Sequence, residues 1–185
     1  QFSAKKYKYK VDVIVGGSPC QAFSIAGRRA GLDDTRGTLF YEYARVIAEC
    51  RPKIFFYENV KGLLNHDNGN TWEVVRSVFD SLGYKIYFSV LNSRDYGIPQ
   101  NRERVFVVGF RDKERDYVFP EKKLLRKKIF SFLDKKIESK YFLSDKGVAF
   151  VNDEYRIKRK YTQVNGYVSI CQKANQQSNL HGDFI

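Results

Sequence analysis

Short apolar strands alternate with amphipathic helices along the first 110 residues of this chain, and this order limits the folds that the chain can adopt. Residues 11–15 and 53–60 are apolar runs of the kind that form buried strands. Residues 38–50 and 72–82 carry their apolar side chains at helical spacing. This alternation predicts an α/β sheet with helices packed on its faces.

Two further strands are predicted over residues 84–91 and 104–110. Only about a dozen residues, without a helical pattern, connect them. A parallel pair needs a longer crossover connection, so the sequence predicts an antiparallel hairpin at the end of the sheet.

The character of the chain changes after Pro120. Residues 121–139 are rich in lysine and place apolar residues on one face, which predicts a connecting helix over 121–140. From residue 141 to 185 the apolar pattern weakens, as at the beginning of another unit. The prediction is therefore a partial catalytic domain over 1–120, a connecting helix, and the first part of a second domain.

The charge of the chain indicates a polyanionic partner. The sequence has 33 Lys and Arg against 21 Asp and Glu, a formal net charge of +12. Nucleic acid is such a partner, although charge of this kind can also serve solubility alone. We expect no membrane partner, because no apolar run approaches the roughly 20 residues that span a bilayer and residues 1–6 do not resemble a signal peptide.

Three widely spaced cysteines argue for a reducing cytoplasm. Cys20, Cys50 and Cys171 form neither a disulfide framework nor a zinc-binding pattern, so we expect no metal. Cys50 lies on the apolar face of a predicted helix and is interpreted as structural. Cys20 differs, because it follows a predicted strand within a turn-forming Gly-Ser-Pro-Cys-Gln segment, where ligands bind in open α/β sheets. It is either a nucleophile or a small buried side chain.

Two more groups of polar residues follow predicted strands. Glu58 ends an otherwise apolar strand, and it either points into the same crevice as Cys20 or is a solvated strand end. Arg102 and Arg104 are two residues apart, so they face the same way on an extended chain. Two guanidinium groups in this arrangement suit a phosphate or a carboxylate, although basic loops are also common.

Together these segments resemble the DNA cytosine-5 methyltransferase family, of the bacterial modification type. Gly-Ser-Pro-Cys-Gln at 17–21 is similar to the nucleophile loop of that family. Glu-Asn-Val at 58–60 matches its Glu-Asn-Val block, and Gln-Asn-Arg-Glu-Arg at 100–104 matches its Gln-x-Arg-x-Arg block. The blocks stand in family order at family-like spacing, and the resemblance covers about residues 11–111.

The resemblance implies a Rossmann-like methyltransferase sheet and a covalent mechanism. Cys20 would attack C6 of a cytosine as a thiolate, in an environment to which Arg102 and Arg104 are candidates to contribute. Protonated Glu58 would hydrogen-bond N3 and the exocyclic amine, and C5 would take a methyl group from S-adenosylmethionine. The target base would be flipped out of double-stranded DNA into the site.

The resemblance also assigns binding residues and a setting. Pro19 and Leu39 would border S-adenosylmethionine. The residues expected to contact DNA are Gln21, Ser24, Arg28, Arg29, Arg36 and Gln100. A bacterial enzyme of this kind would work in the cytoplasm or in association with the nucleoid.

The sequence departs from the family at both ends. Ten residues precede the strand before Cys20, and the glycine-rich turn and ribose-binding acidic residue of the family have no counterpart there. The closing Gly-Asn-Ser turn is also missing, and the chain contains no methionine. We therefore expect an internal fragment, inactive alone, whose cofactor site is completed by missing segments or by a complementary chain. The residues from 141 would then begin a target-recognition domain.

Two alternatives remain open at this stage. One branch of the family methylates tRNA with the same cysteine and glutamate, although the loop at 22–40 favours DNA. A catalytically silent protein that binds DNA or a partner is the other alternative.

Overall fold

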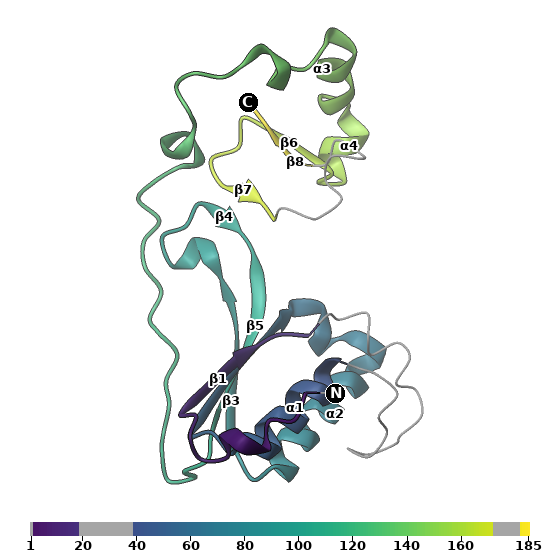
Figure 1. Ribbon diagram of the computed structural model, residues 1–185. Coiled ribbons are helices and arrows are strands. Elements are labelled where there is room, and N and C mark those ends of the chain that lie inside the picture. The colour runs from purple at the N-terminus through teal and green to yellow at the C-terminus, as the bar shows by residue number, and fades with distance from the viewer. Residues whose placement is uncertain (1, 19–38, 172–181) are drawn as a thin grey trace. The chain divides into compact units, whose positions relative to one another are not determined.

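The computed structural model describes residues 2–18, 39–171 and 182–185 (Figure 1). The chain divides into two compact units. The first unit contains residues 1–91 and 103–120, and the second contains residues 92–102 and 121–185. One boundary between the units therefore falls directly after Pro120. Residues 92–102 belong to the second unit, although the residues on both sides of them in the sequence belong to the first.

The first unit is built on a mixed sheet with the strand order β1-β2-β5-β3. The strands are β1 (Val13–Gly16), β2 (Ile54–Val60), β3 (Lys85–Asn92) and β5 (Glu103–Phe110). β1 is parallel to β2, whereas β5 is antiparallel to β2. Helices α1 (Leu39–Cys50) and α2 (Asn70–Ser81) cover one face of this sheet (Figure 1). The predicted α/β class is confirmed.

The hairpin predicted at the end of the sheet is also confirmed. β3 and β5 are hydrogen-bonded neighbours, and a connection as short as residues 93–102 joins antiparallel strands. This connection contains a short 3₁₀ turn, η5 (Ser93–Asp95), and strand β4 (Gln100–Asn101).

Aromatic side chains form the core between the sheet and the two helices. Phe79 of α2 lies at the centre, with its ring centroid 4.5 Å from that of Phe55 and 5.4 Å from that of Phe40. All three side chains are fully buried. Along β2, alternate residues face this core, so Phe55, Tyr57 and Asn59 are buried while Glu58 faces the opposite side.

The prediction of a buried first strand is wrong in one respect. Val13 and Val15 are 45% and 74% exposed, whereas Ile14 packs against the core. Among the described strands β1 is at the edge of the sheet, and its alternate side chains point away from α1 and α2.

The connecting helix predicted over 121–140 is also wrong. Most of the segment has no regular secondary structure, and its helical parts are two 3₁₀ turns, η6 (Ile129–Phe132) and η7 (Ser139–Tyr141). An isolated helix depends on packing of its apolar face for stability. Phe132 and Ile137 of the predicted stripe are 56% and 52% exposed, so the stripe has no core to pack against.

The second unit combines short helices with two small sheets. α3 (Asp145–Val151) and α4 (Glu154–Lys158) begin with side-chain caps from Ser144 and Asp153. β6 (Thr162–Val164) pairs in parallel with β8 (Gly182–Phe184), and β7 (Ser169–Ile170) pairs in parallel with β4. Residues 92–102 are thus tied to this unit by backbone hydrogen bonds.

Candidate active site

Five of the predicted site residues lie in the described part of the chain, namely Leu39, Glu58, Gln100, Arg102 and Arg104. The predictions for Pro19, Cys20, Gln21, Ser24, Arg28, Arg29 and Arg36 lie outside the described residues. The geometry of the site is therefore given by Gly17 and Ser18, which precede Cys20, and by strands β2 and β5.

Glu58 and Arg104 form an ion pair across adjacent strands. The Arg104 Nε atom lies 2.9 Å from Glu58 Oε1. The two residues come from β2 and β5, whose antiparallel register places Val60 opposite Arg104. The Arg104 side chain is 18% exposed and that of Glu58 is 39% exposed. The carboxylate is thus held in a fixed position while remaining open to a ligand.

The chain that leads to Cys20 passes directly against Glu58. A Cβ atom at Gly17 would lie 2.6 Å from the Glu58 carbonyl oxygen and 3.2 Å from its Oε2 atom. Any side chain at position 17 would displace the strand backbone, so glycine is required for this close approach. Two of the three sequence blocks are thereby brought into contact.

A buried polar network fixes the next residue, Ser18. Its hydroxyl oxygen lies 2.7 Å from the Tyr57 hydroxyl, and its carbonyl oxygen accepts a hydrogen bond of 2.8 Å from Asn59 Nδ2. The Asn59 amide also donates to the Tyr57 hydroxyl at 2.7 Å. Asn59 Oδ1 accepts from the backbone N–H of Val60. β2 therefore supplies both the carboxylate and the anchor for the segment that carries Cys20.

The Ser18–Tyr57–Asn59 network was not predicted from the sequence, although two features of the chain indicate it. Tyr57 occupies a core-facing position of β2, and a buried tyrosine hydroxyl needs a hydrogen-bond partner. Asn59 belongs to the Glu-Asn-Val block and is only 3% exposed. A buried amide must likewise be hydrogen-bonded.

Arg102 has different partners from Arg104. Its Nη1 atom lies 3.5 Å from Cys171 Sγ, and its backbone N–H donates to Asn92 Oδ1 at 3.1 Å. All three residues belong to the second unit. The role of Arg102 beside the nucleophile remains a prediction.

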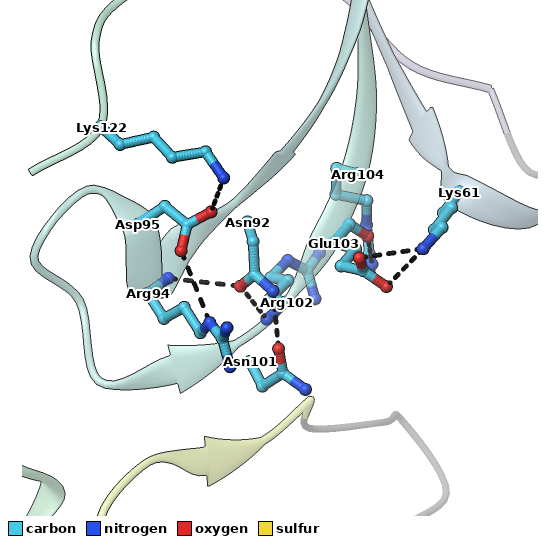
Figure 2. A network of polar contacts seen from close by, with 9 residues as sticks. All are labelled: Lys61, Asn92, Arg94, Asp95, Asn101, Arg102, Glu103, Arg104 and Lys122. Carbon is cyan, nitrogen blue, oxygen red and sulfur yellow. Dashed lines mark hydrogen bonds and ion pairs between the residues drawn. The ribbon is translucent and has the colours of Figure 1, made fainter.

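The loop that contains Gln100 is stiffened by side-chain hydrogen bonds (Figure 2). Asn92 donates to Asn101 Oδ1 at 2.6 Å and accepts from the backbone N–H of Arg94. Asp95 forms an ion pair of 2.9 Å with Lys122, and the hydrogen bond to Lys122 lowers the pKa of this carboxyl. Gln100 itself pairs with Ser169 in the β4–β7 ladder. This loop is therefore an ordered part of the second unit.

Removal of the Ser18–Tyr57 contact is expected to show that the two residues contribute jointly to the free energy of unfolding. Tyr57→Phe removes a buried hydroxyl and leaves Asn59 Nδ2 and the Ser18 hydroxyl each short of a partner, at a cost of about 1–3 kcal/mol. The double variant Ser18→Ala/Tyr57→Phe should cost less than the sum of the single variants. Urea unfolding followed by the fluorescence of Trp72, the single tryptophan, measures these changes.

Tyr84→Phe provides the matched control for this cycle. Tyr84 is also buried, and its hydroxyl donates to the Pro52 carbonyl at 2.8 Å, apart from Ser18. Its effect should add to that of Ser18→Ala within about 0.5 kcal/mol. If the free-energy change of Tyr57→Phe also added to that of Ser18→Ala, the Ser18–Tyr57 contact would carry no coupling energy.

Solved structures share the fold of this chain. A methyltransferase from Entamoeba histolytica, EhMeth, matches 99% of the chain and 57% of its own length with a TM-score of 0.69 at 15% identity. The Dnmt2 methyltransferase of S. pombe matches 99% of the chain and 60% of its own length with a TM-score of 0.67 at 16% identity. The chain therefore shares the fold of these two proteins.

The sequence comparison identifies the family. The model of the C-5 cytosine-specific DNA methylase family matches residues 1–182, and the chain belongs to this family. Type II methyltransferase M1.ScrFI of Lactococcus lactis subsp. cremoris is 45% identical over 139 residues, which are 73% of the chain and 36% of that relative. M.HhaI of Haemophilus parahaemolyticus is 52% identical over 101 residues, 55% of the chain and 31% of that relative. The chain spans about a third of the length of these relatives.

No helix among the described residues is long and apolar enough to span a bilayer.

Proposed function

We propose that the protein transfers a methyl group to C5 of cytosine in double-stranded DNA, with Cys20 as the nucleophile and Glu58 as the group that activates the base. The observation that carries the proposal is the contact of Gly17 with Glu58 beside the buried Ser18–Tyr57–Asn59 network. This contact holds Gly17, three residues before the cysteine, against Glu58. Membership of the C-5 cytosine-specific DNA methylase family supports the same assignment.

In this proposal the chain's own residues perform the activation of the base. The Cys20 thiolate adds to C6 while Glu58 supplies a proton to N3, so that electron density develops at C5. After C5 has taken the methyl group, its proton is lost to water and the thiolate departs from C6, which restores the C5–C6 double bond. N3 then returns its proton to the Glu58 carboxylate, so that the neutral aromatic base and the general acid are both regenerated. Because these atoms are inaccessible in a stacked duplex, the base must leave the helix.

Arg104 is proposed to position Glu58 for this proton transfer. Its guanidinium group is held by the Glu103 carbonyl oxygen at 2.8 Å and contacts Glu58 Oε1 at 2.9 Å. A general acid needs a defined orientation toward its acceptor, and an arginine anchored at two points supplies it.

S-adenosylmethionine is the methyl donor that the family implies, and it would supply an electrophilic methyl group. The described residues do not form a complete site for it. Leu39 is 58% exposed at the start of α1 and offers an apolar contact. In the described part of the chain no glycine-rich turn lies at a strand end before β1.

The remaining binding residues stay predictions. Contact of DNA with Gln100 and with the 21–36 loop, and completion of the cofactor site by other segments or chains, are parts of the same proposal. The same proposal places the protein in the bacterial cytoplasm or in association with the nucleoid.

Product analysis tests this function. The protein, at the natural length made by its host, is incubated with labelled S-adenosylmethionine and either duplex DNA or tRNA, and the nucleosides are separated. We expect labelled 5-methylcytosine from DNA. Label in tRNA alone would replace the DNA assignment with an RNA substrate. Absence of label from both, with DNA binding intact, would favour a catalytically silent protein.

A further inference from the structure

The second unit contains a pocket of about 370 Å³, and Glu58 is not among its lining residues. Its polar lining includes Arg94 and Asn101, from the loop between β3 and β5, and Lys160. Aliphatic side chains complete the wall, among them Ile157, Val164 and Ile170. All of these residues belong to one compact unit.

The charged groups of this pocket give it a positive surface. Within the described residues, Arg94 forms an ion pair with Asp95, at the long distance of 3.5 Å from its Nε atom. Asp95 is more closely engaged by Lys122, at 2.9 Å. Lys160 is exposed at the pocket and is held there by its backbone, which adopts a φ of 54° and donates to the Ile157 carbonyl oxygen. The two cations thus face the pocket with little neutralisation.

The other polar lining groups are already engaged within the unit. Thr162 donates to the Val151 carbonyl oxygen, and Gln163 Nε2 contacts both the Val168 carbonyl oxygen and Asp183. Asn101 accepts from Asn92 with its carbonyl oxygen, and its amide N–H groups are the donors that this side chain can offer a ligand. The pocket therefore presents donors and positive charge toward a ligand.

We propose that this pocket binds one sugar–phosphate unit of the DNA backbone, and the proposal rests on the DNA substrate proposed above. Arg94, Lys160 and the Asn101 amide bind the phosphate oxygens, which accept hydrogen bonds and carry negative charge. The aliphatic wall packs against the deoxyribose. Such a contact positions the duplex on the second unit and carries no base information by itself.

The test is the salt dependence of DNA binding. Fluorescence anisotropy measures the affinity of the chain for a labelled 20-base-pair duplex between about 50 and 200 mM salt, where phosphate contacts give the slope of log K against log salt. The variant Arg94→Gln/Lys160→Gln removes both cations of the pocket. The matched control is Arg126→Gln/Lys146→Gln, which removes the same charges from exposed residues of the same unit outside the pocket.

We expect the slope of the pocket variant to fall by about 1–2 and its affinity to drop by about tenfold or more at the higher salt concentration. The loss should be equal for duplexes of different sequence, and the control should keep the wild-type slope within about 0.5. A slope equal to that of the control would overturn the proposal. So would a loss that depends on base sequence, or a loss seen with an RNA duplex and not with DNA.

This outcome is distinct from a failure of the proposed methyl transfer. The anisotropy measurement needs neither Cys20 nor the cofactor. A protein that methylates DNA but shows no effect of the pocket variant would overturn the pocket alone. A protein that shows the pocket effect without methylation would overturn the chemistry alone.

Discussion

Glu58→Gln is expected to lower the rate of methyl transfer by about 10²–10⁴-fold, the usual contribution of a positioned general acid. Glutamine has the shape of the carboxyl group and can still hydrogen-bond a cytosine, but it cannot deliver a proton to N3. It also alters the group whose Oε1 atom contacts Arg104 Nε at 2.9 Å. The fall should therefore affect kcat, with a smaller change in KM for DNA.

Glu103→Gln is the matched control for this variant. Glu103 lies in the same unit, forms an ion pair with Lys61 at 3.0 Å and is 44% exposed. Its removal takes away one carboxylate close in sequence to Arg104 without touching Glu58, so activity should stay within about twofold, since exposed pairs contribute little. Single-turnover rates of both variants show whether Glu58 takes part in the chemical step. Comparable rates for Glu58→Gln and the control would exclude Glu58 from the chemistry.

Phe79→Ala is expected to destabilise the first unit by about 3–5 kcal/mol, as for large-to-small changes in packed cores. The Phe79 ring contacts Phe40, Phe55 and Tyr57 with centroid distances of 5.4, 4.5 and 5.7 Å, and the side chain is fully buried. Alanine would leave a cavity between α2 and the sheet.

Val74→Ala serves as its control on the same helix. Val74 is 37% exposed, so its truncation should change the free energy of unfolding by no more than about 0.5 kcal/mol. Trp72 and Val75 of α2 both belong to the core of the first unit, so the fluorescence of Trp72 reports unfolding of this unit. A loss below about 1 kcal/mol for Phe79→Ala would contradict the core described here.

Much of the fold could be predicted because its signals are local. The helical spacing of Tyr43, Ile47 and Cys50 and the apolar run of β2 depend on neighbouring residues, and both elements form as predicted. The position of β5 between β2 and β3 depends on contacts distant in sequence, so the sequence pattern alone did not place it.

The errors have the same origin. The apolar stripe of residues 121–139 has helical spacing, but spacing does not show whether a core lies opposite the stripe. Phe132, at 56% exposed, and Ile137, at 52% exposed, remain at the surface, and the helix does not form. Likewise, the apolar run of β1 did not indicate that Val15 would lie at a sheet edge.

The candidate site was predictable in its chemical groups and only partly in its geometry. Glu58 was singled out as a strand-end carboxylate, and the structure adds its ion pair with Arg104. The anchoring of Ser18 by Tyr57 and Asn59 spans some 40 residues of sequence and arises from the pairing of β1 with β2. Such a network becomes visible only when the strands are assembled.

The most direct test of the central claim is the covalent link between Cys20 and cytosine. The natural-length protein is incubated with S-adenosylmethionine and duplex DNA that contains 5-fluorocytosine, whose C5 fluorine cannot leave as a proton does, and the adduct is digested and sequenced by mass spectrometry. The proposed chemistry predicts a methylated nucleotide attached to the Cys20 sulfur and no adduct with Cys20→Ser. An adduct on Cys50 or Cys171, or one that persists in Cys20→Ser, would contradict it.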